Sequence, residues 1–258
     1  MKCKLLLFDL DGTLLQTDKT ISDKTMNALQ KCRELGVMIG VSTSRSVQNS
    51  MFYISKLSPN IIIASGGAVV KNNDEYIYTA EFTNDETRNM IATARKICGA
   101  NCEITIDTLK EHFWNYKIDP NNIDANWGDS IYTDYSEFDK KALKMCVEIF
   151  DKEKANELAK CLRDCDCVKF SDGEWYKFTK KEATKENAIL RMCQALSITV
   201  EDIIAFGDDY VDIGMLKLCS VGVAMGNAID EVKSVADVVI GGNDEDGIAE
   251  YLEESLIK

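Results

Sequence analysis

The side chains in this sequence best suited to chemistry are two carboxylates, Asp9 and Asp11, at the end of an apolar segment. In an extended chain, side chains two residues apart point to the same side, so both would face one site. Gly12 comes next and lets the chain turn away. Two neighbouring acids repel each other unless a cation lies between them. The pair therefore predicts a site that holds a cation.

A second group of acids, Asp208, Asp209 and Asp212, follows a later apolar segment at residues 203–206. Ligands of open α/β sheets bind beyond the carboxyl ends of the strands, so we expect both acidic groups at one edge of one sheet. Lys185 would offset only one of these charges, and a phosphate ester would add about −2 at neutral pH. Such an assembly requires a divalent cation, and oxygen ligands from carboxylates and a phosphate suit Mg²⁺.

Polar residues also follow the apolar segment at residues 37–41, where Thr43, Ser44 and Arg45 come in succession. A hydroxyl and backbone N–H groups at the end of a strand could hold the oxygens of a phosphoryl group. Thr43 could equally cap the helix that we expect next along the chain.

Short apolar segments alternate with helical patterns at both ends of the chain. The expected strands cover residues 4–10, 37–41, 61–64, 203–206, 221–224 and 238–240. Helices are expected after Ser22, which can cap one, and over residues 188–196 and 213–218. The strands are apolar at consecutive positions, which is typical of buried parallel strands. The alternation predicts an α/β fold with a Rossmann-like parallel sheet.

The middle of the chain has a different pattern. Residues 103–107 alternate between polar and apolar, and the other expected elements are strands at 144–149, 168–170 and 175–178 and a helix at 151–163. This pattern is typical of an antiparallel sheet with helices on one face. We therefore expect an α+β cap at residues 82–181, inserted into an α/β catalytic core of residues 1–81 and 182–258. The cap would close over the site and determine substrate specificity.

Composition excludes several partners. The chain has 258 residues and a net charge of −13, which argues against nucleic acid or an anionic membrane. Its apolar start is too short for a signal peptide and no stretch could span a bilayer, so we expect a cytoplasmic protein.

The ten cysteines are expected to be reduced. Cys161, Cys165 and Cys167 lack a fourth ligand at zinc-like spacing, and we expect them to pack instead. These features do not predict the oligomeric state.

His112 is the only histidine, and it stands in the expected cap. It could contact substrate, but an isolated histidine favours a surface or loop position. The three tryptophans, Trp114, Trp127 and Trp175, are expected to pack within the cap.

These residues, in this order, resemble the motifs of the haloacid dehalogenase superfamily, and within it the Cof-like phosphatases of subclass IIB. The first motif corresponds to Asp9-Leu10-Asp11-Gly12-Thr13, the second to Thr43, the third to Lys185, and the fourth to Gly207-Asp208 with Asp212. Residues 222–228 and 243–247 are also similar to segments of this subclass. The resemblance covers the whole chain, with the cap between the second and third motifs. One such motif is moderately specific, whereas four in order are highly specific.

The resemblance implies roles for these residues. Asp9 would be the nucleophile that forms an aspartyl-phosphate, and Asp11 would protonate the leaving alcohol and then activate water. Mg²⁺ would be bound by Asp9, Asp208 and the backbone carbonyl of Asp11. Asp212 would orient Lys185 or a metal-bound water. The phosphoryl oxygens would be held by Thr43, Ser44, Arg45 and Lys185.

Three segments depart from the pattern of the family: the second motif, the segment after the third strand and the fourth motif. Ser44 stands where the family has Gly, and Gly66 where it has Asn. In the fourth motif, Asp209 replaces Gly and Val211 replaces Asn. Val211 cannot hydrogen-bond as Asn would, which affects the surroundings of the metal and the rate but not the nucleophile. Asp209 could compensate from beside the metal ligands.

The expected reaction is the Mg²⁺-dependent hydrolysis of a small phosphomonoester, and sugar phosphates are the substrate class that the resemblance suggests. Two alternatives stay open. A phosphomutase or phosphotransferase would use the same aspartyl-phosphate, although the position of the cap after the second motif disfavours it. An inactive phosphate-binding regulatory module is less favoured, because the nucleophile, the acid and the cation ligands are all present.

Overall fold

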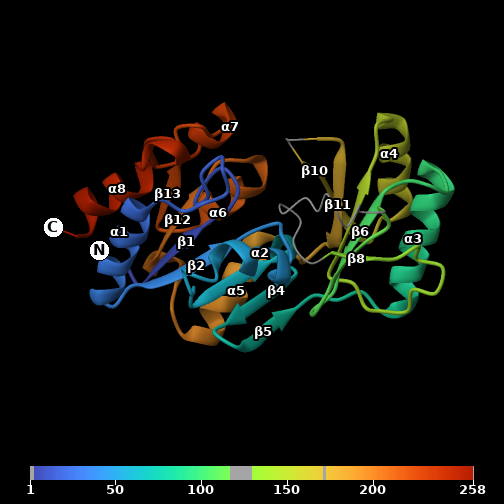
Figure 1. Ribbon diagram of the computed structural model, residues 1–258, viewed down its shortest axis with the longest axis horizontal. Coiled ribbons are helices and arrows are strands. Elements are labelled where there is room, and N and C mark those ends of the chain that lie inside the picture. Colours follow the sequence, from blue (N-terminus) through green and yellow to red (C-terminus); the bar gives the residue numbers. More distant parts are fainter. Residues whose placement is uncertain (1–2, 117–129, 171–172, 258) are drawn as a thin grey trace.

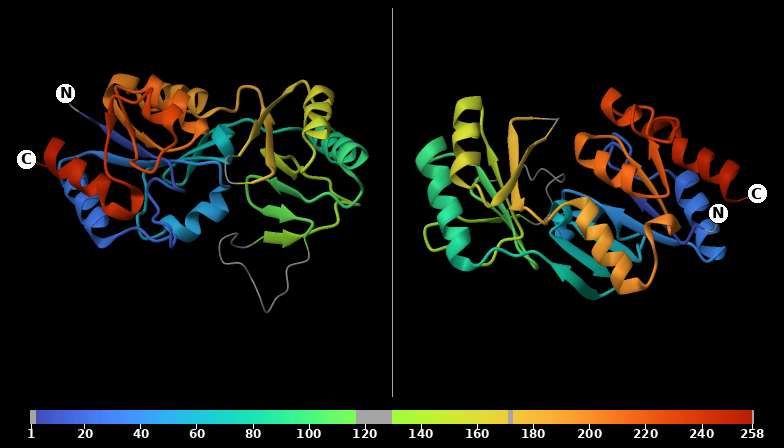
Figure 2. Two further views of the ribbon diagram at one scale, coloured as in Figure 1. Left: turned by 90° about the horizontal axis from the view of Figure 1, so that it is seen from above. Right: turned by 180° about the vertical axis from the view of Figure 1, so that it is seen from behind.

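The computed structural model describes residues 3–116, 130–170 and 173–257. It contains two separate β-sheets, each with its own helices, placed side by side (Figure 1). Both chain termini lie at the end of the molecule remote from the second sheet (Figure 2). The second sheet is built from the middle of the chain, so the fold is an α/β core with an inserted cap, as predicted.

The core sheet has eight strands in the order β14-β13-β12-β1-β2-β3-β4-β5. Their bounds are β1 Leu5–Phe8, β2 Met38–Ser42, β3 Ile61–Ala64, β4 Val69–Asn72, β5 Glu75–Thr79, β12 Ile203–Gly207, β13 Val221–Ala224 and β14 Val238–Val239. The strands from β14 to β3 are parallel, which confirms the predicted parallel sheet. Strands β4 and β5 add an antiparallel hairpin that the sequence analysis did not foresee.

The core helices lie between these strands in the chain. They are α1 Asp23–Glu34, α2 Val47–Ile54, α5 Lys185–Leu196, α6 Ile213–Leu218, α7 Asp230–Lys233 and α8 Gly247–Ser255. Short 3-10 turns are found at η1 Ser65–Gly67, η3 Val200–Asp202, η4 Tyr210–Asp212 and η5 Asn243–Glu245. Ser22 caps α1 as predicted, because its side chain accepts a hydrogen bond from the Thr25 N–H. Helix α1 packs against α8, and α5 against α6.

The cap sheet has six strands in the order β10-β11-β9-β6-β7-β8. Their bounds are β6 Ile104–Asp107, β7 His112–Trp114, β8 Ser130–Tyr132, β9 Lys144–Glu148, β10 Cys165–Lys169 and β11 Trp175–Lys180. The pairing is antiparallel, as predicted, except that β7 and β8 run parallel. Helices α3 Asn84–Cys98 and α4 Lys152–Cys161 cover the face of this sheet that points away from the core (Figure 1).

Each sheet encloses its own apolar cluster. The core cluster includes Leu5, Phe8 and Phe206, and the cap cluster includes Phe178 and Met145. Two separate clusters are the physical basis for two units within one chain. The boundaries at residues 82 and 181 stay a prediction. Within the described part of the chain, no helix has the length and apolarity needed to cross a membrane.

The expectation for His112 is wrong. It lies in β7 and is 3% exposed, because its Nδ1 pairs with the buried Asp107 carboxylate, 2.6 Å away. Trp114 and Trp175 pack edge to face with ring centroids 6.3 Å apart, and Trp127 falls outside the described residues. The three clustered cysteines do not form a possible metal site within the residues that the structure covers.

Candidate active site

Asp9 and Asp208, each the first acid of its group in the sequence, meet at the carboxyl ends of β1 and β12. Phe8 and Phe206 are register partners on these parallel strands, so the next residues along each strand lie at one sheet edge. The Asp9 N–H donates to the Phe206 carbonyl, 3.0 Å away. The sheet thus brings together Asp9 and Asp208, which stand 199 positions apart in the sequence.

Lys185 joins the acids into one ionic cluster. It is the first residue of α5, a helix capped by Thr184, and it is 3% exposed. Its Nζ lies 2.6 Å from Asp9 Oδ1 and 2.6 Å from Asp212 Oδ1. A third bond, to the Ser42 carbonyl at 2.7 Å, ties the ammonium group to the end of β2. The three acceptors fix the position of this cation.

Backbone groups and a hydroxyl orient the other acids. Asp212 Oδ2 accepts hydrogen bonds from the N–H groups of Asp208, at 3.0 Å, and Asp209, at 3.1 Å. The Thr13 hydroxyl donates to Asp208 Oδ1 at 2.5 Å. Gly12 has a φ of +76°, and a Cβ there would collide with the Asp208 carboxylate. The glycine is therefore needed both for the turn and for the close approach of Asp208.

The acids of this cluster carry more negative charge than Lys185 neutralises. Burial raises the pKa of Asp9 well above its usual value, and Asp212 and Asp208 add to the rise while Lys185 opposes it. Burial, and then the charge of Asp212, raises the pKa of Asp208 to about 7. Burial alone would lower the pKa of Lys185, but Asp212 and Asp9 outweigh it and raise this pKa.

The donor set fits a divalent cation. Oxygens of Asp9, Asp208 and Asp212 lie within 4.8 Å of one another. Both Asp212 oxygens already accept hydrogen bonds from Lys185 or backbone N–H groups. The Oδ2 atoms of Asp9 and Asp208, by contrast, have no hydrogen-bond partner among the residues that the structure describes. Asp9 and Asp208 are therefore the carboxylates best placed to hold a cation, whereas Asp212 contacts Lys185 and the backbone of Asp208 and Asp209.

Asp11 lies in a different ionic environment. Its carboxylate accepts from Arg45 Nε at 2.6 Å and from Lys19 Nζ at 2.8 Å. Burial would raise the pKa of Asp11, but Arg45 and Lys19 outweigh it and lower the pKa. The Arg45 guanidinium also stacks over the ring of Tyr53, 4.7 Å from its centroid. Asp11 thus stands apart from the buried acids as an ionised carboxylate.

The loop after β2 contacts Asp11 through Arg45 and the cap through the Ser44 carbonyl. Thr43 is 1% exposed, and its Oγ1 accepts from the Arg45 N–H at 3.1 Å. Helix α2 is capped by Ser46 and not by Thr43, which excludes the alternative role that we considered for Thr43. The Ser44 carbonyl accepts from Lys144 of the cap at 2.6 Å.

Several residues of the site had no role assigned to them in the sequence analysis. Lys19 and Thr13 contact the acids directly. Asn227 Nδ2 donates to the Gly12 carbonyl at 2.8 Å, and Asn243 Nδ2 to the Leu15 carbonyl at 3.0 Å. The sequence does point to both asparagines, because each lies in one of the two C-terminal segments that resemble the family, residues 222–228 and 243–247. These segments brace the loop that carries Asp11.

Asp209 adds its negative charge to the effects that raise the pKa of Asp208, after burial and Asp212. Its Oδ1 accepts from the Tyr210 N–H at 2.7 Å and so stabilises the turn that delivers Asp212. This departure from the family pattern therefore acts on the backbone of the fourth motif.

Comparisons with known proteins agree with this geometry. The family described as haloacid dehalogenase-like hydrolase matches residues 6–252. A 5-amino-6-(5-phospho-D-ribitylamino)uracil phosphatase of Bacillus subtilis is 28% identical over 253 residues, covering 96% of this chain and 94% of that protein. A second Bacillus subtilis phosphatase of the same name is 27% identical over 262 residues, covering 97% and 96%. A haloacid dehalogenase-like hydrolase from Bacteroides thetaiotaomicron superposes with a TM-score of 0.85 at 25% identity, over 98% of this chain and 99% of that one.

Proposed function

Because this chain belongs to the haloacid dehalogenase-like hydrolase family and is a phosphatase, we propose that it hydrolyses a small phosphomonoester through an aspartyl-phosphate on Asp9. The proposed substrate is a sugar phosphate or a similar metabolite, and the proposed cofactor is Mg²⁺. The observation that carries this proposal is the chain of ion pairs from Asp9 through Lys185 to Asp212, beside Asp208.

Asp9 is the proposed nucleophile because Lys185 fixes its carboxylate beside Asp208. Lys185 binds Oδ1 of Asp9. One oxygen of this carboxylate can then attack the phosphorus atom while the other faces the proposed cation, and the alcohol leaves. Water hydrolyses the resulting acyl phosphate in a second step, so that one difficult reaction becomes two easier ones. Lys185 can also hold a phosphoryl oxygen next to Asp9, which favours the charged transition state.

Asp9, Asp208 and the backbone carbonyl of Asp11 would hold Mg²⁺, which would neutralise the carboxylates and the phosphoryl oxygens. The raised pKa values of Asp9 and Asp208 support this assignment, because a cation between two acids keeps both ionised. An ionised Asp9 is required for attack. Asp212 would keep Lys185 and the Asp208 backbone in position.

Asp11 is the proposed acid and base, and its ion pairs explain how substrate could activate it. As an acid it must carry a proton, which Arg45 and Lys19 disfavour in the free protein. A phosphoryl group brings about two negative charges and competes for both cations. If Arg45 turns from Asp11 to the phosphoryl group, the pKa of Asp11 rises and proton donation to the alcohol becomes easier.

Two hydroxyls of the loop after β2 are proposed to contact the phosphoryl group. Ser44 Oγ is buried and has no hydrogen-bond partner within the described part of the chain, and a phosphoryl oxygen would supply an acceptor. Thr43 lies on the same loop. The cap, which we place at residues 82–181, would select the alcohol, because all four motifs lie outside it.

The test is phosphate release from p-nitrophenyl phosphate and a panel of sugar phosphates in the presence of Mg²⁺. We expect activity in the wild type, none in Asp9→Asn, and wild-type activity in Asp74→Asn, a matched change at an exposed carboxylate of the β4–β5 turn. Free inorganic phosphate supports hydrolysis, whereas an isomeric phosphosugar would indicate a phosphomutase. Retained turnover in Asp9→Asn would refute the proposed nucleophile.

A further inference from the structure

The two faces of the cap sheet differ in chemistry. The face that packs on α3 and α4 carries apolar side chains such as Phe178 and Met145. Side chains alternate between faces along a strand. The neighbours of these two residues, Lys177 on β11 and Lys144 on β9, therefore point to the opposite face, toward the core (Figure 1). The register pairs Lys177 with Cys146, so the two lysines are diagonal neighbours on that face.

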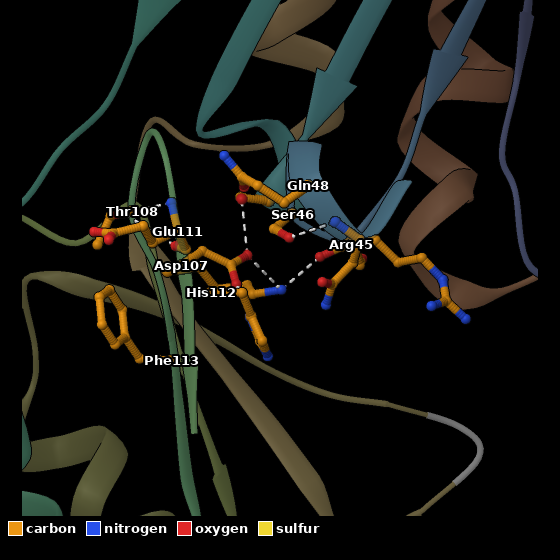
Figure 3. Close-up of polar contacts among 12 residues, drawn as sticks. Arg45, Ser46, Gln48, Asp107, Thr108, Glu111, His112 and Phe113 are labelled. Atoms are coloured by element: carbon orange, nitrogen blue, oxygen red, sulfur yellow. Dashed lines mark hydrogen bonds and ion pairs between the residues drawn. The ribbon is translucent and has the colours of Figure 1, made fainter. Parts of the chain in front are cut away.

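One buried carboxylate on this face, Asp107, is already fully used. Its oxygens contact Lys144 Nζ at 2.9 Å, His112 Nδ1 at 2.6 Å and Ser65 Oγ at 2.8 Å. Lys144 also donates to the Ser44 carbonyl, so this ion pair bridges cap and core. Figure 3 shows Asp107 and His112 on the cap side of the junction and Arg45 and Ser46 on the core side. Lys144 therefore has its counter-ion.

Lys177 has none. Its side chain is 4% exposed, and no carboxylate lies within ion-pair distance of its Nζ in the described residues. The charged and titratable groups around it are Asp166 on β10, Lys144 and Cys146 on β9, and Lys185 on α5. Burial, the largest effect, and the two lysines lower the pKa of Lys177 to about 8. A buried ammonium group without a counter-ion is unfavourable unless an anion joins it.

The ammonium group of Lys177 lies beside the active-site loop. A Cβ on Gly66 would be 2.8 Å from Lys177 Nζ, so the ammonium group lies against the backbone at this position, where the family pattern has Asn. The Gly66 N–H donates to the Thr43 carbonyl at 3.1 Å. A Cβ on Gly67 would be 2.8 Å from the backbone N of Lys185. Lys177 thus lies against the Gly66–Gly67 turn, which also contacts Thr43 and Lys185, two of the residues proposed to bind the phosphoryl group.

We propose that Lys177 binds a second anionic group on the alcohol part of the substrate. The substrate class is then a phosphomonoester whose alcohol also carries a carboxylate or a second phosphate. The inference rests on the proposed function, since it assumes that the scissile phosphoryl group is at Asp9. Lys177 is a specificity-determining residue and takes no part in bond breaking.

The experiment compares three substrates with the same six-carbon chain: glucitol 6-phosphate, 6-phosphogluconate and glucitol 1,6-bisphosphate. Glucitol 6-phosphate carries no further anionic group, 6-phosphogluconate carries a carboxylate, and glucitol 1,6-bisphosphate carries a further phosphate. Comparing the three shows whether a carboxylate or a phosphate is preferred as the additional anionic group. p-Nitrophenyl phosphate serves as a substrate whose leaving group carries no second anionic group. We expect the wild type to prefer at least one of the two doubly anionic substrates.

Three variants separate charge from structure. Lys177→Met removes the charge at similar volume, Lys177→Arg keeps it, and Lys180→Met makes the same change on the same strand near α3. We expect Lys177→Met to lower kcat/KM for the preferred anionic substrate about 10- to 100-fold, the range for a hydrogen bond to a charged group. Turnover of glucitol 6-phosphate and p-nitrophenyl phosphate should be retained. Lys177→Arg should keep the preference, and Lys180→Met should leave all rates unchanged.

A pH profile gives a readout that a purely structural role would not move. The ammonium form binds the anion, so the preference for the anionic substrate over glucitol 6-phosphate should fall as the pH rises through about 8. Titrations common to both substrates cancel in this ratio. In Lys177→Arg the fall should disappear, because arginine stays protonated.

The outcomes separate the two proposals. If Lys177→Met leaves the substrate ratio unchanged while p-nitrophenyl phosphate is still hydrolysed, the inference is wrong and the hydrolase proposal stands. If the wild type prefers glucitol 6-phosphate, the inference is equally wrong. Phosphate release from no substrate at all, p-nitrophenyl phosphate included, would refute the hydrolase proposal itself.

Discussion

Asp9 and Asp11 stand two residues apart, yet their surroundings move their pKa values in opposite directions. Burial keeps the pKa of Asp9 high although Lys185 touches it. Asp11 is more exposed, and Arg45 and Lys19 keep its pKa low although burial opposes them. The Asp9 carboxylate is buried among other acids, which suits a metal ligand and nucleophile. The Asp11 carboxylate contacts two cationic side chains, which suits a proton carrier.

The two acids should therefore fail differently when mutated. Asp9→Asn should show neither turnover nor a covalent adduct. Asp11→Asn should lose about 10²- to 10⁴-fold in turnover, the usual contribution of general acid–base catalysis. With an aryl phosphate, whose leaving group hardly needs an acid, it should release a burst of phenol and then turn over slowly. Intact-mass spectrometry after rapid quench should find one added phosphoryl group on Asp11→Asn.

One combination of results with these two variants would refute the proposed mechanism. If Asp11→Asn never accumulates the phosphoryl adduct while Asp9→Asn retains turnover, Asp9 is not the nucleophile.

Metal removal should affect both activity and stability. Chelation with EDTA should abolish phosphate release, and added Mg²⁺ should restore it. Mg²⁺ should also raise the melting temperature of the wild type, because a ligand that binds only the folded state stabilises it. Asp208→Asn removes one proposed ligand and should lose most of this rise. Full activity after thorough metal removal, or an equal rise in Asp208→Asn, would contradict the proposed site.

At the scale of elements, the hydrophobic pattern predicted most of the core. Strand β3 Ile61–Ala64 has the expected bounds, because an uninterrupted apolar segment between turn signals leaves few alternatives, and helix α6 Ile213–Leu218 also has the expected bounds. The hairpin of β4 and β5 was missed, since β5 is exposed or half-buried along its whole length and carries no apolar periodicity. A strand held by backbone pairing at a sheet edge leaves little trace in side-chain patterns.

Contacts between side chains on neighbouring strands or loops were also not predicted from the sequence. The motifs located Asp9, Lys185 and Asp208, because their order in the chain is itself informative. The burial of His112 depends on the register that places it opposite Asp107, and the sequence does not contain that register. The contact of Lys19 with Asp11 depends on the path of a loop in the same way.

The Asp107 ion pairs should contribute to stability in a pH-dependent way. Burial raises the pKa of Asp107, but Lys144 and His112 outweigh it and hold the pKa below its usual range. The stabilisation is therefore fully present above the unfolded pKa of about 4 and is lost as the pH falls toward the folded value. Asp107→Asn leaves Lys144 buried and unpaired, so it should cost on the order of 3 kcal/mol at pH 7.

Urea unfolding of wild type and Asp107→Asn at several pH values measures this difference. It should shrink as the pH is lowered below about 4. Glu148→Gln, a matched change on β9 at a carboxylate without an ion pair among the described residues, is the control. A difference that stays constant with pH would show that the loss is not electrostatic.

At the scale of the whole molecule, the separation of two apolar clusters predicts a division of labour. Replacing residues 82–181 by a short linker removes the cap and leaves all four motifs. The shortened protein should keep some hydrolysis of p-nitrophenyl phosphate and lose its discrimination among metabolites. Kinetics with the substrate panel would measure both, with circular dichroism to show that the core is folded. Unchanged metabolite preference in a folded protein without the cap would contradict the assignment.

The place of β1 in the core sheet has a consequence for the order of folding. β1 lies between β2 and β12, and its register partner Phe206 is synthesised almost 200 residues after Phe8. On the ribosome, one edge of this apolar strand therefore stays unpaired while the whole cap emerges, and contacts so distant in sequence form slowly. The cap can bury its own cluster earlier, because its contacts are closer in sequence. The edge that carries the proposed site needs both strands, so it forms only after residues 203–207 have been made, and a chain released before residue 203 would expose an unpaired, aggregation-prone strand.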